Sequence, residues 1–365
     1  MGLHKHRTSV GLDLGSHTLK AVEVVPADGK FKISRVALAP TPAGAVTEGV
    51  ATDPALLAPA IRALLDEGGI RTKRVVTAVG GEAVIIRELK LPEMPQVELE
   101  RAVAFEAERY LPAGVQDVSR DFQVLGKSSE EKQLDILLVA ARKELVDRQL
   151  APLRAVGLSS SVMEVTSFSM VRAFETNGSN GSHDTGESHG DATVYVDLGA
   201  ESSDIIVMEG DRLRLARNIP IGGNAVTKAI AEAMSVEFDA AQTLKERQAQ
   251  LFVDGERPED MVLQHVHEAM LPVLTSIFTE VRRSMDFYTA RSRGQAIAKV
   301  VLTGGTAKLK NLARYLGDEL GVPVEVGNPF ETHQVDAGIP PEHLADVGPM
   351  MAVAVGLALR GARER

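Results

Sequence analysis

The same short device occurs twice in this chain, far apart in the sequence. An apolar strand ends in Asp-Leu-Gly, a few small polar residues follow, and a second apolar strand returns: VGLDLGSHTLKAVEVV starts at Val10 and VYVDLGAESSDIIV starts at Val194. A carboxylate at the end of a buried strand is costly unless hydrogen bonds or a cation compensate it. The glycine permits a tight turn, and the amides after it can converge on an anion. The pattern predicts two hairpins whose turns bind a negatively charged group.

Each turn on its own is no more than an ordinary Asp-Gly β-turn. Two of them facing each other would hold a polyphosphate, and the carboxylates of Asp13 and Asp197 would steer a hydrated Mg²⁺ beside it. The residues expected around the phosphates are Asp13, Gly15, Ser16, His17, Thr18 and Lys20 in the first turn, and Asp197, Gly199, Ala200, Glu201 and Ser202 in the second.

The rest of the chain can be divided around these two turns. Its 365 residues suffice for two or more domains, at roughly 100–200 residues per domain. Residues 177–192 are rich in Gly, Ser and Asn and predict a flexible loop between the halves. Strands and helices alternate, which indicates α/β layers. The expected parts are a lobe I core at 1–83 and 145–180, an inserted α/β subdomain at 84–144, a lobe II core at 193–222 and 295–345, a helical subdomain at 223–294, and a C-terminal helix at 346–365 that packs back on the core.

Local patterns predict the main helices and strands. Asp53 and Pro54 are typical of a helix start, and Gly68-Gly69 ends that helix. The alternating stretch EAVIIRELKL at 82–91 predicts a strand with an exposed edge, and VVLTGGTAKLKNLARYL at 300–316 predicts a strand, a Gly-Gly turn and a helix. Further helices are expected at 95–111, 143–156, 259–290 and 346–360, and further strands at 8–15, 19–25, 31–40, 74–80, 192–198 and 203–208.

Composition narrows the classes of function. The chain contains no cysteine, which excludes disulfides, thiol catalysis and thiolate metal sites. Its formal net charge of −10 argues against nucleic acid as the main partner, because nucleic acids are bound by basic surfaces. No apolar run, MMAVAVGLAL included, approaches the ~20 residues that cross a bilayer. If a membrane matters, we expect a partner to provide the anchor.

The motifs together resemble the actin-like ATPases, the superfamily of actin, sugar kinases and heat-shock chaperones. The two turns are similar to its phosphate loops, VVLTGGTAKLKNLARYL to its adenosine loop, and AVTKAIAEAMSVEFDAAQTLKER to its helical subdomain. The resemblance implies an α/β, actin-like (ribonuclease H-like) fold of two lobes with a small inserted subdomain and a helical subdomain. It adds as nucleotide-binding residues Gly222, Gly223, Asn224, Gln242, Lys245, Gly304, Gly305, Thr306 and Lys308. Gln242 stands where the superfamily carries a glutamate, and its amide can still hydrogen-bond a ribose hydroxyl.

The stretch SVMEVTSFSMVRAF at 161–174 resembles the superfamily's connecting helix. Glu164 falls there at the position that orients the attacking water, so the resemblance implies a catalytic role for it. The alternative is an ordinary carboxylate at a helix start. Weak ATPase activity is therefore left open, and the expected role is primarily that of a nucleotide-binding scaffold.

A narrower resemblance is to the PilM family, the actin-like proteins of type IV pilus assembly. VGLDLGSHTLKAVEV, the insertion at 84–144, NIPIGGNAVTKAIAE and TGGTAKLKNLARYL follow in that order. The resemblance implies a cytoplasmic protein, peripheral to the inner membrane, that binds ATP and Mg²⁺ and serves twitching or DNA uptake. Its partner would be the cytoplasmic N-terminal tail of an inner-membrane pilus protein of the PilN type, held in the groove between lobe I and the insertion. Other pilus-motor components and a second copy of the chain are further candidate partners.

Three alternatives stay open at this point. FtsA of the cell-division ring is the nearest relative of the PilM family, but FtsA ends in a linker and a membrane-binding helix, whereas this sequence ends at LALRGARER. The related cytoplasmic domain of a type II secretion component is the second. A small-molecule kinase is the third, although nothing in the sequence resembles a sugar pocket.

Overall fold

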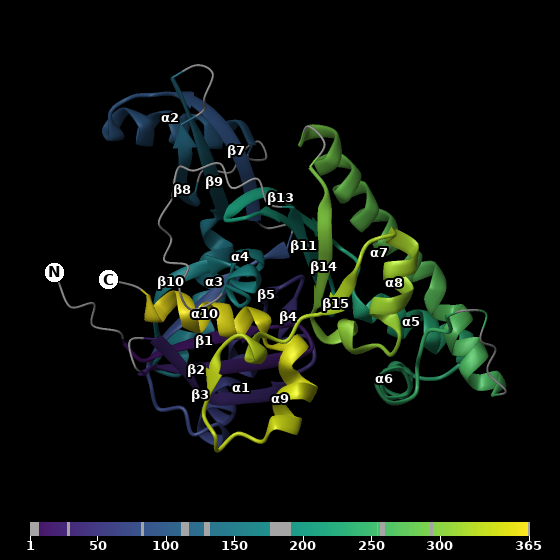
Figure 1. The fold of residues 1–365 in the computed structure, drawn as a ribbon. Helices are drawn as coiled ribbons and strands as arrows, with labels where there is room; N and C mark the ends of the chain where they lie inside the picture. Colours follow the sequence, from purple (N-terminus) through teal and green to yellow (C-terminus); the bar gives the residue numbers. More distant parts are fainter. Residues whose placement is uncertain are drawn as a thin grey trace.

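The computed structural model of the chain has two lobes, a helical subdomain on the second lobe and a small separate sheet above the first (Figure 1). The residues that it describes are 7–27, 30–81, 84–110, 117–127, 132–175, 191–253, 255, 260–292 and 295–363. Of the loop predicted at 177–192, only residues 191 and 192 lie within the described residues.

Lobe I is built on a six-stranded sheet with the order β10-β6-β1-β2-β3-β16. Its strands are β1 (Ser9–Leu14), β2 (Thr18–Ala27), β3 (Lys30–Pro40), β6 (Arg74–Val79), β10 (Ser159–Val165) and β16 (Gln334–Val335). β1 pairs antiparallel with β2 and parallel with β6. Helices α1 (Pro54–Glu67) and α3 (Lys143–Ala155) pack on one face of the sheet, and α4 (Thr166–Arg172) and α10 (Ala352–Ala362) pack on the other.

The first helix of lobe I begins where the sequence predicts. Asp53 Oδ1 accepts hydrogen bonds from the amides of Ala55 at 2.9 Å and Leu56 at 3.1 Å, and Pro54 occupies the first helical position, where no amide is needed. The helix ends before Gly69, whose φ of +63° a glycine adopts without strain.

Lobe II repeats the arrangement of lobe I. Its sheet has the order β13-β12-β11-β14-β15, and β11 pairs antiparallel with β12 and parallel with β14, as β1 does with β2 and β6. The strands are β11 (Ala192–Leu198), β12 (Ser203–Glu209), β13 (Arg212–Ile219), β14 (Ile297–Thr303) and β15 (Val324–Val326).

Four helices accompany the lobe II sheet. They are α5 (Gly223–Met234), α6 (Phe238–Arg247), α7 (Met261–Arg291) and α8 (Leu312–Leu320). In α7, the residues Val266, Met270, Leu274, Ile277 and Val281 are fully buried at helical spacing. This one apolar stripe holds the long helix against the sheet and explains why the sequence pattern predicts it.

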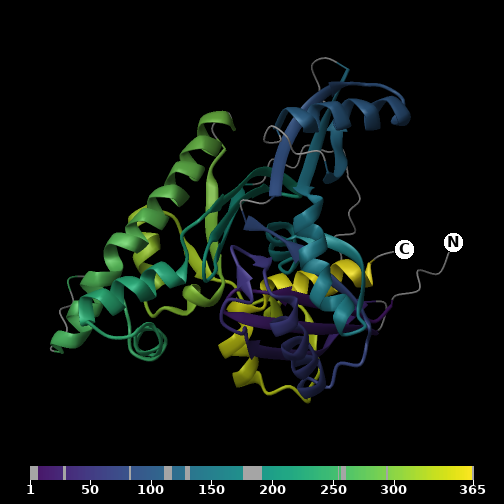
Figure 2. The same cartoon turned by 180° about the vertical axis from the view of Figure 1, so that it is seen from behind.

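The insertion forms its own small α/β unit. An antiparallel sheet with the order β7-β9-β8 consists of β7 (Val84–Pro92), β9 (Gln133–Arg142) and β8 (Val118–Lys127). Helix α2 (Gln96–Tyr110) buries Leu99, Val103 and Ala107 against residues of β9 such as Ile136 and Leu138. The unit stands above lobe I, and β7 runs down toward β13 in both views (Figures 1 and 2).

The C-terminal helix starts later than the sequence predicts. Helix α9 (Pro341–Val347) is followed by a 3₁₀ turn at Gly348–Met350, and α10 begins only at Ala352. Proline removes an amide and restricts the preceding residue, so Gly348-Pro349 interrupts the expected continuous helix.

Helix α10 lies buried between β1 and α4 and belongs to a core that includes residues of both lobes, such as Met170 and Ile206. Two glycines allow this close approach. A Cβ on Gly11 would lie 2.1 Å from the carbonyl oxygen of Ala354, and one on Gly356 would lie 1.7 Å from that of Ser169. Within the described part of the chain, no single helix is long and apolar enough to cross a membrane; α9 and α10, bent by 92°, satisfy the length and composition requirement only as a pair.

Candidate functional site

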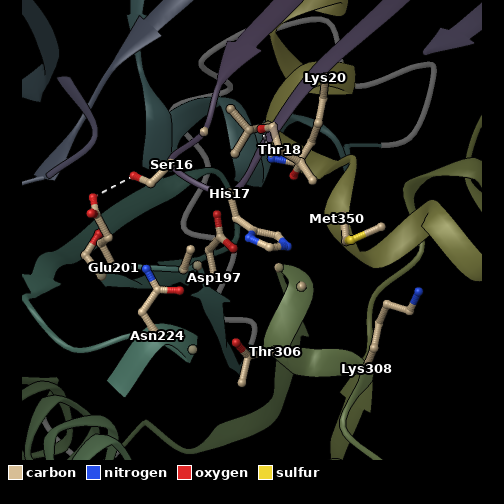
Figure 3. A pocket seen from close by; sticks show the side chains of 18 of the residues that line it. Ser16, His17, Thr18, Lys20, Asp197, Glu201, Asn224, Thr306, Lys308 and Met350 are labelled. Atoms are coloured by element: carbon tan, nitrogen blue, oxygen red, sulfur yellow. Dashed lines mark hydrogen bonds between the residues drawn. The ribbon is translucent and has the colours of Figure 1, made fainter. Parts of the chain in front are cut away.

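The two Asp-Leu-Gly turns face each other across a cavity of about 610 Å³ between the lobes. Ser16, His17 and Thr18 extend into it from lobe I, and Asp197 and Thr306 approach from lobe II (Figure 3). The predicted residues that line it are Asp13, Gly15, Ser16, His17, Thr18, Lys20, Asp197, Gly199, Ala200, Glu201, Ser202, Gly223, Asn224, Gln242, Lys245, Gly304, Gly305, Thr306 and Lys308. Segments from five separate parts of the sequence thus meet at one site.

Gly222 is predicted at the site but does not line the cavity. It lies behind the second turn, where a Cβ would come within 2.6 Å of the carbonyl oxygen of Ala200. Its neighbours tie α5 to the turn, because the amides of Gly223 and Asn224 donate to the carbonyl oxygens of Gly199 and Ala200 at 2.8 and 2.7 Å.

Glu164 lies near the end of strand β10, two residues before helix α4 begins at Thr166. The strand forms because its backbone pairs parallel with β6, with Glu164 opposite Ala78, a long-range contact that the local pattern does not reveal. The Glu164 carboxylate lies 2.8 Å from Arg172 Nη1 and 3.4 Å from Arg360 Nε. It is not among the residues that line the cavity, so the structure does not bring it to the site.

The first turn contains a nearly buried ion pair. Lys20 Nζ lies 2.8 Å from Asp13 Oδ2, and the side chains are only 12% and 15% exposed. Both residues line the cavity, so the ammonium can meet an anion there and the carboxylate a cation.

The second turn contains an acidic pair. Loss of hydration raises the pKa of Asp197 to about 7; the charges of Asp204 and Asp13 act in the same direction, and Lys20 opposes them. Burial also raises the pKa of Asp204 to about 6, against a hydrogen bond from Asn218. A cation beside Asp197 would favour its ionised form. The donor chemistry of this turn therefore fits a hard divalent cation such as Mg²⁺.

Asp13 and Asp197 provide at most two carboxylate ligands. Among the residues that the structure describes, no group of three or more His, Asp or Glu side chains could hold a metal ion. Mg²⁺ in phosphate sites commonly keeps several waters and uses one or two carboxylates together with the phosphates. The residues present fit that arrangement.

The Gly-Gly turn after β14 forms the part of the cavity wall next to Asp197. Gly304 has a φ of +86°, and a Cβ there would lie 2.4 Å from both Asp197 Oδ1 and the carbonyl oxygen of Leu198. Only glycine fits this position. The helix predicted directly after the turn is delayed by a 3₁₀ turn at Gly305–Lys308, and α8 begins at Leu312.

Helix α6 contributes a partly buried lysine to the cavity wall. Lys245 Nζ donates to the carbonyl oxygen of Gly223 at 3.0 Å and to Thr227 Oγ1 at 2.7 Å. Burial lowers the pKa of Lys245 to about 8, with Glu246 acting against the shift. Gln242 Oε1 accepts from Thr227 Oγ1 at 2.6 Å. These bonds fix α6 against α5 and hold both predicted side chains at the cavity.

Among the described residues, two contacts between side chains cross the cavity from lobe to lobe. Ser16 Oγ donates to Glu201 Oε2 at 2.6 Å (Figure 3), and His17 Nε2 lies 3.5 Å from Glu246 Oε1. The sequence predicts Ser16, His17 and Glu201 as binding residues. It does not predict that side chains of the two lobes contact each other.

The site also includes residues that the sequence did not reveal. Gln149 of α3 is 3% exposed and lines the cavity; its only local signal is a polar residue on the apolar face of a helix. It accepts from the amide of Ala51 at 3.1 Å and donates to the carbonyl oxygen of Ala78 at 3.0 Å. Other unforeseen lining residues include Thr166, Gln248, Ala249, Gln250 and Met350.

This geometry defines a class of protein. Two sheets of the same topology, each presenting an Asp-Leu-Gly hairpin to a common cavity, form the actin-like fold. MreB 5 of Spiroplasma citri, solved bound to AMPPNP, superposes with a TM-score of 0.52 over 97% of this chain and 96% of that one, at 11% identity. The fold class predicted from the sequence is therefore confirmed.

The chain belongs to the family of the type IV pilus assembly protein PilM, whose family model matches residues 11–362. It is similar to a solved PilM-PilN type IV pilus biogenesis complex, with a TM-score of 0.84, 34% identity and 99% coverage of both chains. Cell division protein FtsA of Pseudomonas aeruginosa is 24% identical over 397 residues, covering 98% of this chain and 89% of FtsA. The resemblance to the PilM family is thus confirmed, together with the relationship to FtsA.

Proposed function

We propose that the chain is a cytoplasmic scaffold of type IV pilus assembly that binds ATP and Mg²⁺ between its lobes and docks the cytoplasmic tail of a PilN-type membrane protein. One observation carries the nucleotide part: two Asp-Leu-Gly turns from separate sheets open on one cavity of about 610 Å³. The relative solved with AMPPNP supports the choice of an adenine nucleotide.

The roles of the residues follow from their chemistry. The amides after Gly15 and Gly199 bind phosphate oxygens, and Lys20 turns from Asp13 toward the phosphates. Asp13 and Asp197 hold Mg²⁺ through its water ligands, and the ion neutralises phosphate charge. Because Glu164 is paired with arginines outside the cavity lining, binding rather than turnover is the proposed role, and Glu164 retains at most an indirect one.

A binding assay tests the nucleotide part. We expect saturable, Mg²⁺-dependent ATP binding by calorimetry and a clear rise in melting temperature, because a ligand at a hundredfold excess over its Kd stabilises the folded state by ~2.7 kcal/mol. NAD serves as the control ligand. An equal response to NAD, or none to Mg-ATP, would refute the assignment.

The docking part rests on a second cavity at the base of the insertion. It measures about 310 Å³ and is lined by Gly80, Gly81, Val84, Ile86, Arg87, Val165, Ser167, Asp204, Ala216, Arg217 and Asn218. The wall therefore combines lobe I, the start of β7 and strand β13 of lobe II. Among the residues that the structure describes, Asn218 Oδ1 is buried beside this cavity without a hydrogen-bond partner, and Val84 and Ile86 add apolar side chains to the wall.

Strand β7 supplies a suitable edge. Within the described strands it pairs only with β9, and an extended peptide can add to such an edge through main-chain hydrogen bonds, while pockets select its side chains. Burial raises the pKa of Glu88 on β7, and the nearby charges of Arg214 and Arg291 of lobe II oppose the rise, so this part of β7 lies close to lobe II. The solved PilM-PilN complex supports a PilN-type partner.

A matched pair of variants tests the docking part. Ile86→Asp places a charge in the cavity wall, whereas Val124→Asp places the same charge on β8, the opposite edge of the same sheet, where Val124 is 36% exposed. We expect Ile86→Asp to weaken binding of a fluorescent PilN-type N-terminal peptide at least tenfold and Val124→Asp to leave it unchanged. If both variants fold and fluorescence polarisation gives them equal affinities for the peptide, this cavity is not the docking site.

The place in the cell and the process follow from the partner. We propose that the chain is peripheral to the inner membrane through the PilN-type tail, and that the pilus it serves acts in twitching or DNA uptake. Other pilus-motor components and self-association remain secondary proposals. Loss of membrane association in cells that lack the PilN-type protein is the expected result; retention would overturn the proposal.

A further inference from the structure

One carboxylate of lobe II occupies two hydrogen-bond donors of lobe I. Glu201 Oε2 accepts from Ser16 Oγ at 2.6 Å and from the backbone amide of Glu48 at 2.5 Å. Both bonds join lobe I to lobe II, and both end on the same oxygen atom. Ser16 belongs to the first Asp-Leu-Gly turn and Glu201 to the second, so the contact joins the two elements predicted to bind phosphate.

The fold holds the Glu48 amide in position. Strands β4 (Val46–Thr47) and β5 (Val50–Ala51) form a two-residue hairpin whose central residues, Glu48 and Gly49, have φ values of +52° and +73°, the geometry of a type I′ turn. The buried amide of Gln149 ties this hairpin to the sheet by accepting from Ala51 and donating to Ala78.

Lobe I therefore presents a fixed pair of donors that converge on one point of the cavity wall. Two convergent neutral donors suit an anionic oxygen, and charge-assisted bonds of this kind are stronger than neutral ones. A phosphate oxygen and a carboxylate oxygen are equivalent acceptors for such a pair. Only one of them can occupy it at a time, because two anions at the same donors repel each other.

We propose that Ser16 Oγ and the Glu48 amide are the lobe I half of a site for the outermost phosphate of the nucleotide, and that Glu201 fills this site when no nucleotide is bound. The inference rests on the proposed nucleotide binding. The carboxylate acts as an intramolecular substitute for the phosphate, so a nucleotide must displace it. Glu201 thereby lowers the affinity for nucleotides that reach the site and leaves the affinity for adenosine unaffected.

Three variants test the competition. Glu201→Ala removes the carboxylate, Glu201→Gln keeps an acceptor oxygen without the charge, and Glu232→Ala removes an equal charge from an exposed position on α5 (69% side-chain exposure). We expect Glu201→Ala to bind Mg-ATP about five- to tenfold more tightly than the wild type, since two hydrogen bonds to a charged group no longer have to be broken. Glu201→Gln should gain less, and Glu232→Ala nothing. Adenosine should bind all four proteins equally.

A second measurement, on the nucleotide-free protein, separates this proposal from the function on which it rests. Hydrogen exchange over residues 46–51 should accelerate in Glu201→Ala, because the Glu48 amide loses its acceptor, and Mg-ATP should restore protection. Weaker ATP binding by Glu201→Ala, or an equal gain in Glu201→Gln, would overturn the competition and assign Glu201 to binding or to general charge repulsion. If neither ATP nor adenosine binds the wild type, the proposed nucleotide-binding function fails. Faster exchange in Glu201→Ala would then show that the Glu201 contact only ties the two lobes together. That result would also refute the competition between Glu201 and phosphate.

Discussion

Asp197 and Asp204 lie directly opposite each other on the antiparallel strands β11 and β12. Asp197 lines the cavity between the two turns. Asp204 lines both this cavity and the second cavity, which lies at the base of the insertion. Like charges opposite each other destabilise a strand pair, and burial raises the pKa of both carboxyls. The pair is therefore poised to respond to protons and to a cation.

The first prediction concerns pH. In the unfolded chain both carboxyls ionise near pH 4, whereas the pKa of Asp197 in the folded protein is about 7. Between these values the folded protein holds a proton that the unfolded chain has released, so its free energy of unfolding falls as the pH rises. We expect Asp197→Asn to reduce the loss of stability between pH 5 and pH 8 by ~1–3 kcal/mol in urea unfolding. The control is Asp66→Asn on the exposed face of α1; identical slopes in wild type and Asp197→Asn would refute the prediction.

The second prediction concerns the ion pair of the first turn. Asp13→Ala removes a proposed cation ligand and frees Lys20, which is 2.8 Å away, to meet phosphate. Mg-ATP affinity should fall about tenfold, a loss of ~1.4 kcal/mol, while the affinity for ATP in EDTA stays the same or rises. Calorimetry with and without metal measures both. Asp336→Ala, which breaks a remote pair with Lys32, should change neither value, and an equal loss with and without metal would exclude the role of Asp13 at the cation.

The third prediction concerns the packing of α10. A Cβ on Gly356 would lie 1.7 Å from a backbone oxygen of α4, which cannot rotate away as a side chain could. We expect Gly356→Ala to destabilise the protein by ~3 kcal/mol, the upper end of the usual cost of overpacking. Gly126→Ala on β8, where nothing lies within 4 Å of the added Cβ, is the control. A chemical denaturation curve with an unshifted midpoint for Gly356→Ala would contradict the close contact.

The fourth prediction concerns communication between the two cavities. Gly80, Gly81 and Asp204 line both, so a ligand in one contacts a wall of the other. If Mg-ATP changes the affinity for the PilN-type peptide by some factor, the peptide must change the affinity for Mg-ATP by the same factor. Titrations in both orders measure the two factors. Asp204→Asn should reduce them together, and a factor of one in both directions would show that the cavities are independent.

The features that the sequence predicts well are those with local causes. The cap of α1 needs only Asp53 and Pro54, the hairpin turns need only Asp-Leu-Gly, and the stripe of α7 repeats at helical spacing. The meeting of the two turns at one cavity was predictable because the same device occurs twice.

The features that it misses depend on contacts between distant parts of the chain. Glu164 looks like the start of a helix, but pairing with β6 makes it part of a strand. Gln149 binds partners 71 and 98 residues away, and Glu48 meets a carboxylate 153 residues further on. No local pattern encodes these distances, because they arise only when the lobes have assembled.

The burial of α10 against β1 determines when lobe I can finish folding. A ribosome adds on the order of 10 residues per second, so β1 is made roughly half a minute before the helix that covers it. During that interval the part of the first sheet that α10 covers stays exposed, and exposed apolar surface makes incomplete chains prone to aggregation. Lobe I is thus closed by a helix that is synthesised long after β1, and nascent chains that stall before α10 leave the surface that it covers exposed.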